Sequence, residues 1–259
     1  MINLQQIIEQ YPDYLRGHKE SILKEYLQCR ILYIIFESKY ANKLSFLGGT
    51  SLRILYSNSR FSEDLDFDNF GLNLDEFTDL SKIIKEALER EGLKVEIEVK
   101  ARNNFRIKIR IPEILFNLNI SPLLNKKILI QVDASLKRFD YTPNEVILNK
   151  FEVFTKIYTT PKDILLSQKI NTVFNRKRIM GRDFFDIVFL YGMSVKPNFE
   201  FLNKELGIKN NQDLREYLLN KSKDIDFNLL AKDIESLIFN QKDKNRVILF
   251  EQFVKDNIN

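Results

Sequence analysis

The segment from Phe46 to Phe67 constrains the fold of this chain more than any other. It begins with Phe46-Leu-Gly-Gly-Thr-Ser-Leu-Arg53 and ends with Asp64-Leu-Asp-Phe67. An apolar run that is broken by two glycines predicts a short strand that turns directly into a helix. The two aspartates alternate with apolar residues, as expected of a strand that buries one face. The pattern therefore predicts a tight turn beside an acidic strand.

The glycine turn allows two interpretations. Gly48 and Gly49 would let phosphate oxygens approach the main chain, and the start of the following helix adds partial positive charge. The hydroxyls of Thr50 and Ser51 could donate further hydrogen bonds. The Gly-Lys-Ser/Thr ending of a Walker loop is missing. The structural alternative is a tight turn in which Thr50 or Ser51 caps the helix.

Three acidic residues are candidates for a metal site. Asp64 and Asp66 point to the same side of their strand, where two like charges repel unless a cation lies between them. Asp133 follows the apolar run Ile128–Val132 and would end that strand as a third carboxylate. With one histidine and one cysteine in the chain, a metal would be held by oxygen, which favours Mg²⁺ or Mn²⁺. The alternatives are a solvated acidic edge strand and an ordinary turn residue at position 133.

Hydrophobic periodicity predicts an α+β chain in two parts. The first part, residues 1–155, is expected to hold a small mixed β-sheet with flanking helices. The second part, residues 156–259, is expected to be α-helical and to close over the cleft of the first. The predicted helices span residues 20–40, 50–56, 75–90, 161–175, 182–191, 211–220, 226–239 and 244–257, with Asp75 as the cap of the third, and the predicted strands span 45–47, 64–70, 94–100, 105–111 and 128–132.

A basic stripe of Arg106, Lys108 and Arg110 shares one face of its predicted strand. If Arg102–Asn104 is a hairpin turn, one register sets Glu98 opposite Arg106 and Glu96 opposite Lys108. Cross-strand ion pairs are then favoured over contacts to RNA phosphates. The basic residues Arg176, Lys177, Arg178 and Arg182 are better candidates for an RNA-facing rim, although such runs are often solvated loops.

Composition sets the broad class. The 259 residues carry a net charge of +4, which permits a nucleic-acid partner without requiring one. No apolar stretch approaches the ~20 residues of a membrane span, and the N-terminus shows no signal-peptide pattern. A single cysteine, Cys29, excludes an intrachain disulfide and fits a reducing cytoplasm. A cytoplasmic protein without a membrane partner is therefore expected.

These motifs together resemble a known family. Leu47-Gly48-Gly49, the Asp64–Phe67 block and a strand that ends in Asp133 resemble the polymerase-β-type nucleotidyltransferase superfamily. The blocks Gly48–Arg53 and Arg60–Phe67, with Lys169 and Arg182–Asp186 further on, are similar to the AbiEii/AbiGii toxin family. These are nucleotidyltransferase-like toxins of type IV toxin–antitoxin and phage-abortive systems.

The resemblance implies roles for individual residues. Gly48, Gly49, Thr50 and Ser51 correspond to the phosphate-cradling turn, and Arg53 and Ser62 to polar residues that flank the triphosphate. Asp64 and Asp66 correspond to the metal-binding pair, with Asp133 as our choice for the third acid. Lys169 corresponds to a lysine that contacts nucleotide phosphate, and Asp183 to the aspartate that follows it. Without the family pattern, Lys169 would be a solvated helix lysine and Arg182-Asp183 a pair at a helix start.

The resemblance also implies an activity. A metal-dependent enzyme of this family moves a nucleoside monophosphate from an NTP to an acceptor hydroxyl and releases pyrophosphate, with Mg²⁺ or Mn²⁺ as cofactor. The acceptor would be RNA, such as the 3′ end of tRNA, or a protein serine or tyrosine, and an antitoxin protein is a possible partner. Two alternatives stay open: a catalytically silent nucleotide- or RNA-binding protein that acts through a partner, and a nucleotidyltransferase that modifies a small molecule.

Overall fold

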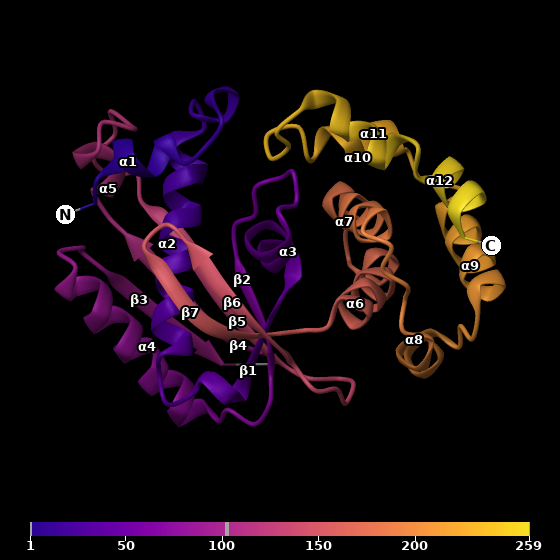
Figure 1. Ribbon diagram of the computed structural model, residues 1–259, viewed down its shortest axis with the longest axis horizontal. Helices are drawn as coiled ribbons and strands as arrows, with labels where there is room; N and C mark the ends of the chain where they lie inside the picture. Colours follow the sequence, from indigo (N-terminus) through magenta and orange to yellow (C-terminus); the bar gives the residue numbers. More distant parts are fainter. Residues whose placement is uncertain (1, 102–103, 259) are drawn as a thin grey trace. The chain divides into compact units, whose positions relative to one another are not determined.

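The computed structural model describes residues 2–101 and 104–258, and these form two compact units. The first unit comprises the chain up to Tyr56 together with Phe61–Thr160, and the second comprises Ser57–Arg60 together with the chain from Pro161 onwards (Figure 1). The chain thus passes into the second unit after Thr160, whereas the sequence pattern placed the change at residue 155. The four residues 57–60 join the second unit although they lie early in the sequence.

A mixed β-sheet forms the centre of the first unit. Within the described residues it has seven strands in the order β3-β4-β5-β2-β1-β7-β6. Strand β2 runs antiparallel to β1 and parallel to β5, and β1 runs parallel to β7. The strands are β1 (Leu44–Leu47), β2 (Leu65–Asn69), β3 (Glu96–Ala101), β4 (Phe105–Ile111), β5 (Ile128–Leu136), β6 (Asn144–Lys150) and β7 (Val153–Thr159). The predicted α+β class with a small mixed sheet is confirmed.

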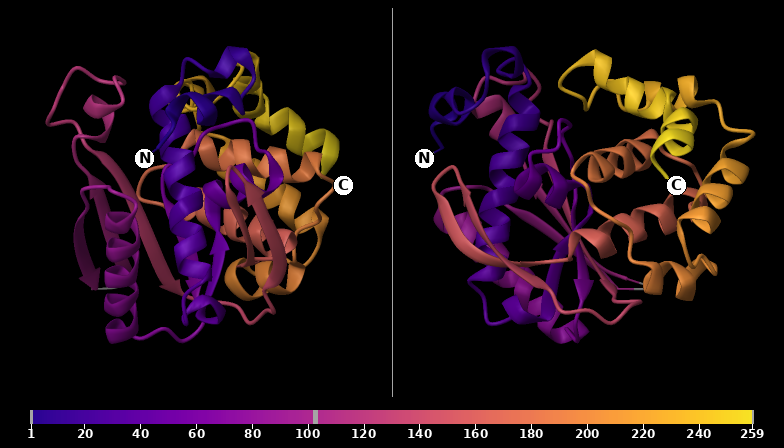
Figure 2. Two further views of the ribbon diagram at one scale, coloured as in Figure 1. Left: turned by 60° about the vertical axis from the view of Figure 1, so that its left-hand side comes forward. Right: turned by 45° about the vertical axis from the view of Figure 1, so that its right-hand side comes forward.

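Two long helices cover one face of this sheet. The helices of the first unit are α1 (Leu4–Glu9), α2 (Lys19–Phe36), α3 (Gly48–Tyr56), α4 (Leu74–Arg90) and α5 (Ile114–Asn117). Helices α2 and α4 lie side by side, α2 against β5 and β7 and α4 against β3 and β4 (Figure 2). The alternating residues Ile107, Ile109 and Ile111 of β4 are buried on this side. The predicted long helix is confirmed as α2, which buries Cys29 as a packed thiol.

The packing on α2 decides which way the acidic strand faces. Phe67 of β2 packs on Phe36 of α2, with ring centroids 6.1 Å apart. Because side chains alternate along a strand, Leu65 and Phe67 point toward α2, and Asp66 points to the opposite side of the sheet. The buried face thus fixes the direction of the acids.

The second unit is helical. Its helices are α6 (Lys162–Asn175), α7 (Gly181–Gly192), α8 (Phe199–Leu206), α9 (Asn211–Ser222), α10 (Phe227–Lys232), α11 (Asn245–Ile248) and α12 (Phe250–Asn257). Phe184 of α7 lies at its core, edge-on to both Phe227 and Phe250 at centroid distances of 5.1 and 4.7 Å. The predicted helices 161–175, 182–191 and 211–220 are confirmed. The predicted helix 226–239 ends early at Lys232, and the predicted helix 244–257 is divided at Leu249.

Further differences from the prediction occur in both units. Strands β6 and β7 and helices α1 and α5 of the first unit, and helix α8 of the second unit, were not predicted from the sequence. The helix expected to begin at Asp75 begins one residue earlier, because Asn73 is its cap. The Asn73 side chain accepts from the backbone N–H of Glu76, and the Glu76 carboxylate accepts in return from the N–H of Asn73. This reciprocal capping box leaves Asp75 in the first turn.

Candidate active site

The three predicted acids lie on neighbouring strands of the first unit. In the sheet register Leu47 is opposite Asp66, and Asp66 is opposite Asp133. Residues that are directly opposite each other in adjacent strands share a face, and the strands are about 4.8 Å apart. The structure therefore brings Asp66 and Asp133 together on the face of the sheet that is turned away from α2.

Asp64 lies one residue before β2 and joins the same group through β5. The Nε2 of Gln131 donates to Oδ1 of Asp64 at 3.1 Å. Since Gln131 lies two residues before Asp133 on the same strand, it shares the face of Asp133. The predicted Ser62 lies just before these acids, and its backbone carbonyl accepts from Nε2 of Gln28 at 3.1 Å.

The glycine turn lies directly against Asp66. Gly48 is the first residue of α3 and has a φ of +82°, a conformation that glycine adopts without steric cost. A Cβ at position 48 would overlap with Oδ2 of Asp66. Gly48 is thus required both by the backbone conformation and by the carboxylate beside it.

The hydroxyls of the turn point into the protein. Thr50 donates to the backbone carbonyl of Asp64, and Ser51 Oγ donates to the carbonyl of Gly48 at 2.9 Å. Both side chains are fully buried. Thr50 thereby links α3 to the acidic strand, and Ser51 closes the first turn of α3. Thr50 and Ser51 therefore do not cap the helix as predicted, because both hydroxyls donate to backbone carbonyls.

Asp133 does not end its strand, as the sequence pattern had predicted, but lies in the middle of β5. Its partner on the other side is Arg106 of β4, which lies directly opposite. Arg106 Nε is 2.5 Å from Oδ1 of Asp133 and Nη2 is 3.0 Å from Oδ2. The guanidinium therefore engages both carboxylate oxygens.

The hairpin register differs from the predicted one by two residues. Glu98 lies opposite Lys108, and Arg106 lies opposite Lys100 rather than Glu98. The turn predicted at Arg102–Asn104 includes residues 102 and 103, which lie outside the described residues. Arg106 is consequently left to pair with Asp133, and the hydrogen bond to this carboxylate, followed by the charges of Asp133, Asp64 and Asp66, raises the pKa of Arg106.

The donor chemistry of the acids fits a divalent cation. Asp64, Asp66 and Asp133 offer carboxylate oxygens, the ligands that Mg²⁺ and Mn²⁺ prefer. In the described part of the chain, no three His, Cys, Asp or Glu side chains are gathered closely enough to hold a metal ion. A cation held by Asp133 would meet the guanidinium of Arg106 on the same carboxylate.

Comparison with protein families now places the chain. The family described as nucleotidyl transferase AbiEii toxin, type IV TA system, matches residues 30–244. The chain belongs to this AbiEii family. The protein is therefore a nucleotidyltransferase. Membership of this family implies an NTP substrate and an antitoxin partner. The resemblance stated from the sequence is confirmed.

Solved structures show the same fold. MenT4, the nucleotidyltransferase toxin Rv2826c from Mycobacterium tuberculosis H37Rv, is 15% identical, with a TM-score of 0.58 over 98% of this chain and 88% of that one. JHP933 from Helicobacter pylori is 18% identical, with a TM-score of 0.55 over 92% of this chain and 93% of that one. Comparison with curated protein sequences returns no match. No helix in the described residues of this AbiEii-family chain is long and apolar enough to cross a membrane.

Arg53 of this AbiEii-family protein lies in a buried charge cluster. Its Nε donates to Oε2 of Glu25 at 2.8 Å, and Lys150 also pairs with Glu25. The hydroxyl of Tyr11 donates to Glu25 as well, at 2.9 Å. Burial alone would raise the pKa of Glu25, but Lys150 and Arg53 outweigh it and lower the pKa. The structure thus gives Arg53 an interior partner, a placement that the sequence did not indicate.

Lys169 and Asp183 lie in the second unit of this AbiEii-family chain. Lys169 Nζ is 3.2 Å from Oδ1 of Asp183 and 2.8 Å from Oδ2 of Asp186. Asp186 also accepts from Arg60, with Nη2 at 2.6 Å and Nε at 2.8 Å. Burial alone would raise the pKa of Asp186, but the charges of Arg60 and Lys169 hold it well below its usual range.

Sequence reasoning assigned no role to Asp186 or to its partner Arg60 in this network. The side chain of Arg60 is 2% exposed, and that of Asp186 is fully buried. The segment of Arg60 is held in the second unit by a bridge between Arg60 and Ile238 and by the N–H of Phe239, which donates to the carbonyl of Ser59 at 3.1 Å. Arg60 and Asp186 each lie in a block that matches the family, so the sequence marked both residues. It did not show that they form an ion pair.

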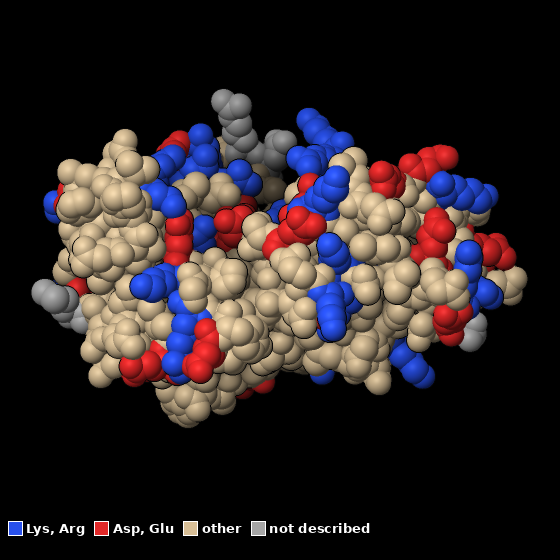
Figure 3. Space-filling model, turned by 90° about the horizontal axis from the view of Figure 1, so that it is seen from above, with Lys and Arg blue, Asp and Glu red and all other residues tan. Residues whose placement is uncertain are grey.

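The predicted RNA-facing rim is partly occupied by ion pairs. Arg176 Nη1 lies 3.2 Å from Oδ2 of the buried Asp183, and Arg178 pairs with Asp233 at 2.9 Å. Lys and Arg side chains are interspersed with Asp and Glu side chains on the face shown in Figure 3. Because Arg176 and Arg178 pair with acids of the second unit, the RNA-facing rim stays a prediction.

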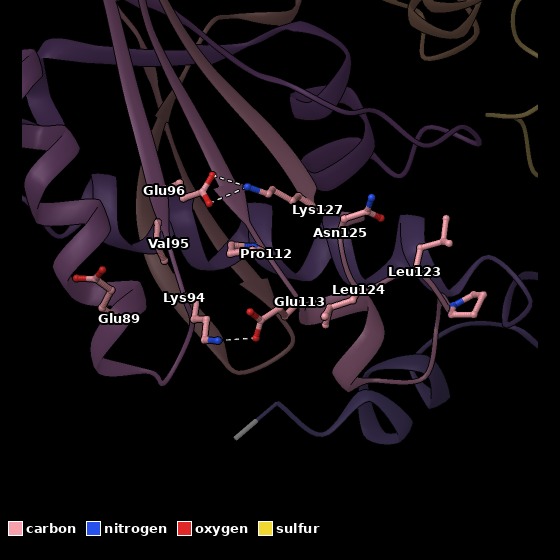
Figure 4. Close-up of a pocket in the computed structure, with 11 residues that line it drawn as sticks. Glu89, Lys94, Val95, Glu96, Pro112, Glu113, Leu123, Leu124, Asn125 and Lys127 are labelled. Atoms are coloured by element: carbon pink, nitrogen blue, oxygen red, sulfur yellow. Dashed lines mark hydrogen bonds and ion pairs between the residues drawn. The ribbon is translucent and has the colours of Figure 1, made fainter.

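A separate pocket of about 800 Å³ lies away from the acids in the first unit. It lies where α4 leads into β3, where β4 ends and where β5 begins, and its wall carries the ion pairs Lys94–Glu113 and Lys127–Glu96 (Figure 4). Lys127 comes six residues before Asp133, roughly 20 Å along an extended chain. This pocket therefore provides a surface on which control substitutions can be made.

Proposed function

We propose that this AbiEii-family enzyme transfers a nucleoside monophosphate from an NTP to an acceptor hydroxyl in a metal-dependent reaction. The observation that carries the proposal is the register that sets Asp66 between the Gly48 turn and Asp133. A phosphate-binding turn, two acids at the start of one strand and a third acid on the neighbouring strand are the elements that phosphoryl-transfer chemistry requires.

Asp64, Asp66 and Asp133 would hold the cation, for which Mg²⁺ is the proposed ion and Mn²⁺ the substitute. Bound there, it would neutralise the triphosphate and the charge that develops during transfer. Asp133 would in addition orient the acceptor hydroxyl and attract its proton. The carboxylate oxygens of the three residues support this assignment.

Gly48, Gly49, Thr50 and Ser51 would form the phosphate-binding turn. The first N–H groups of a helix have no partner within the helix, and they point toward its N-terminus together with the positive end of the helix dipole. The hydroxyls of Thr50 and Ser51 would hold the turn in shape, since both donate to backbone carbonyls. Arg53 and Ser62 are also proposed to flank the triphosphate, and this proposal rests on the family pattern alone.

Lys169 and Asp183 are proposed to act on the nucleotide, again through the family pattern. The buried ion pair between them has a chemical consequence, because a phosphate that binds Lys169 would compete with Asp183 and Asp186 for its ammonium group. For a substitution of Lys169, the matched control would be the same substitution at Lys162, at the start of the same helix.

RNA, including the 3′ end of tRNA, is the proposed acceptor, and a toxin-like role in growth control or phage defence follows from the family. The acceptor is identified by incubating the protein with each α-³²P-labelled NTP, Mg²⁺ and total cellular RNA, followed by gel separation. Label in RNA supports the proposal, and label in protein points to transfer of a nucleoside monophosphate to a side chain. If neither is labelled, pyrophosphate release points to a small-molecule acceptor, and no release points to a catalytically silent binding protein. Asp64→Ala combined with Asp66→Ala should remove all label transfer.

A further inference from the structure

Arg106 is the cation that pairs with the Asp133 carboxylate. A metal ion that binds Asp133 would have to compete with it. The guanidinium of Arg106 forms two hydrogen bonds with the Asp133 carboxylate, one to each oxygen. The side chain of Arg106 is 43% exposed and that of Asp133 17% exposed, so solvent and ions reach the pair. A carboxylate whose two oxygens are held in this way presents only its remaining lone pairs to another cation.

We propose that Arg106 is the resident counter-ion of Asp133 and that it competes with the divalent cation for this carboxylate. The inference rests on the proposed function, since it takes Asp133 as a ligand of the catalytic ion. Arg106 is thus a positioning residue: it acts on the metal through Asp133 and not by touching the reacting atoms.

The sheet explains why a cation is needed at this position. Asp66 and Asp133 are directly opposite each other, and like charges that close destabilise the strand pair. Arg106, opposite Asp133 on the other side, offsets this repulsion while no metal is bound. When a divalent ion binds the acids, it takes over this role, and the fixed positive charge of Arg106 then opposes it.

Lys108 provides a matched control. It lies two residues further along β4 on the same face, opposite Glu98 and Gln131 rather than opposite an acid of the site. Substituting Lys108 removes the same charge from the same strand. A competition that is specific to the Arg106–Asp133 contact should therefore appear in one variant and not in the other.

The experiment measures Mn²⁺ binding to the full chain without nucleotide, from the electron paramagnetic resonance signal of free Mn²⁺. Because exposed ion pairs are weak, Arg106→Gln is expected to bind Mn²⁺ only about 3- to 10-fold more tightly than the wild type. Lys108→Gln should change the affinity less than about 2-fold. Asp133→Asn should weaken binding, and the double variant Arg106→Gln/Asp133→Asn should lose the gain.

Each result decides the question. Equal gains in Arg106→Gln and Lys108→Gln would show general electrostatics and overturn the proposal, as would an unchanged or weaker affinity in Arg106→Gln. If Asp66→Asn abolishes binding while Arg106→Gln changes nothing, only this inference fails; if the wild type binds no Mn²⁺, the metal assignment of the proposed function fails with it. Arg106→Lys keeps the positive charge but cannot form both hydrogen bonds to Asp133, so it should give an intermediate gain in Mn²⁺ affinity. This variant replaces Arg106→Gln if the glutamine variant does not fold.

Discussion

At the scale of single residues, glycine 48 couples the backbone to the proposed chemistry. Gly48→Ala forces a Cβ into a left-handed conformation and against Oδ2 of Asp66. We expect a loss of about 2–3 kcal/mol in the free energy of unfolding, measured in urea, and a loss of transfer activity. Gly92→Ala is the control, since Gly92 has a φ of +85° and no atom within 4 Å of the added Cβ. It should cost about 1 kcal/mol and leave activity intact; equal losses of activity would contradict the role of Gly48 beside Asp66.

The buried pair of Arg60 and Asp186 is the second prediction at this scale. Arg60→Met removes one partner of a fully buried carboxylate, so we expect a loss of about 3–5 kcal/mol, measured as a lower urea midpoint. Arg60→Met combined with Asp186→Leu removes both charges and should recover part of this loss. A double variant as unstable as the sum of both single variants would show that the two residues are not coupled.

At the scale of elements, the start of α4 is a test of local structure. Asn73→Ala removes one half of the capping box and should lower the free energy of unfolding by about 1 kcal/mol. Asp75→Ala, in the first turn of the same helix, should cost only a few tenths of a kcal/mol. Equal effects on the urea midpoint would argue that Asp75 contributes as much as the observed cap.

The sequence was informative where the signal is local. The long apolar run of α2, the glycine turn and the alternation around Asp66 each depend on neighbouring residues, and the corresponding elements were predicted. The register of the β3–β4 hairpin depends on how the turn closes, and a shift of two residues keeps every side chain on its face, so the pattern could not choose between the two registers. Strand β6, Asn144-Glu-Val-Ile-Leu-Asn-Lys150, has no regular alternation and gave no signal.

The candidate site shows the same division. The carboxylates of Asp64 and Asp66 and the Gly48 turn could be predicted because all lie within one segment. The contact of Asp133 with Arg106 depends on the order β4-β5-β2, and no local pattern encodes strand order. Likewise, Arg60 reaches Asp186 only because residues 57–60 fold with the second unit.

At the scale of the whole molecule, each unit holds a buried carboxylate whose pKa is lowered: Glu25 in the first and Asp186 in the second. A folded-state pKa below the unfolded value adds stability that is fully present above about pH 5 and is lost progressively as the pH falls toward the folded-state pKa. The urea midpoint should therefore fall as the pH drops below about 5. Glu25→Gln should flatten this dependence in the first unit, and an unchanged slope would contradict the ionised state of Glu25.

The central claim is that the acids beside the glycine turn carry the transfer, and pyrophosphate release with NTP and Mg²⁺ tests it most directly. Asp66→Asn is compared with Asp68→Asn, a change on the same face of the same strand at an aspartate that accepts from the hydroxyl of Tyr141 at 2.7 Å. We predict that Asp66→Asn lowers the rate by about 10³-fold or more, while Asp68→Asn stays within about 10-fold of the wild type. A folded Asp66→Asn variant that releases pyrophosphate as fast as the wild type would contradict the account.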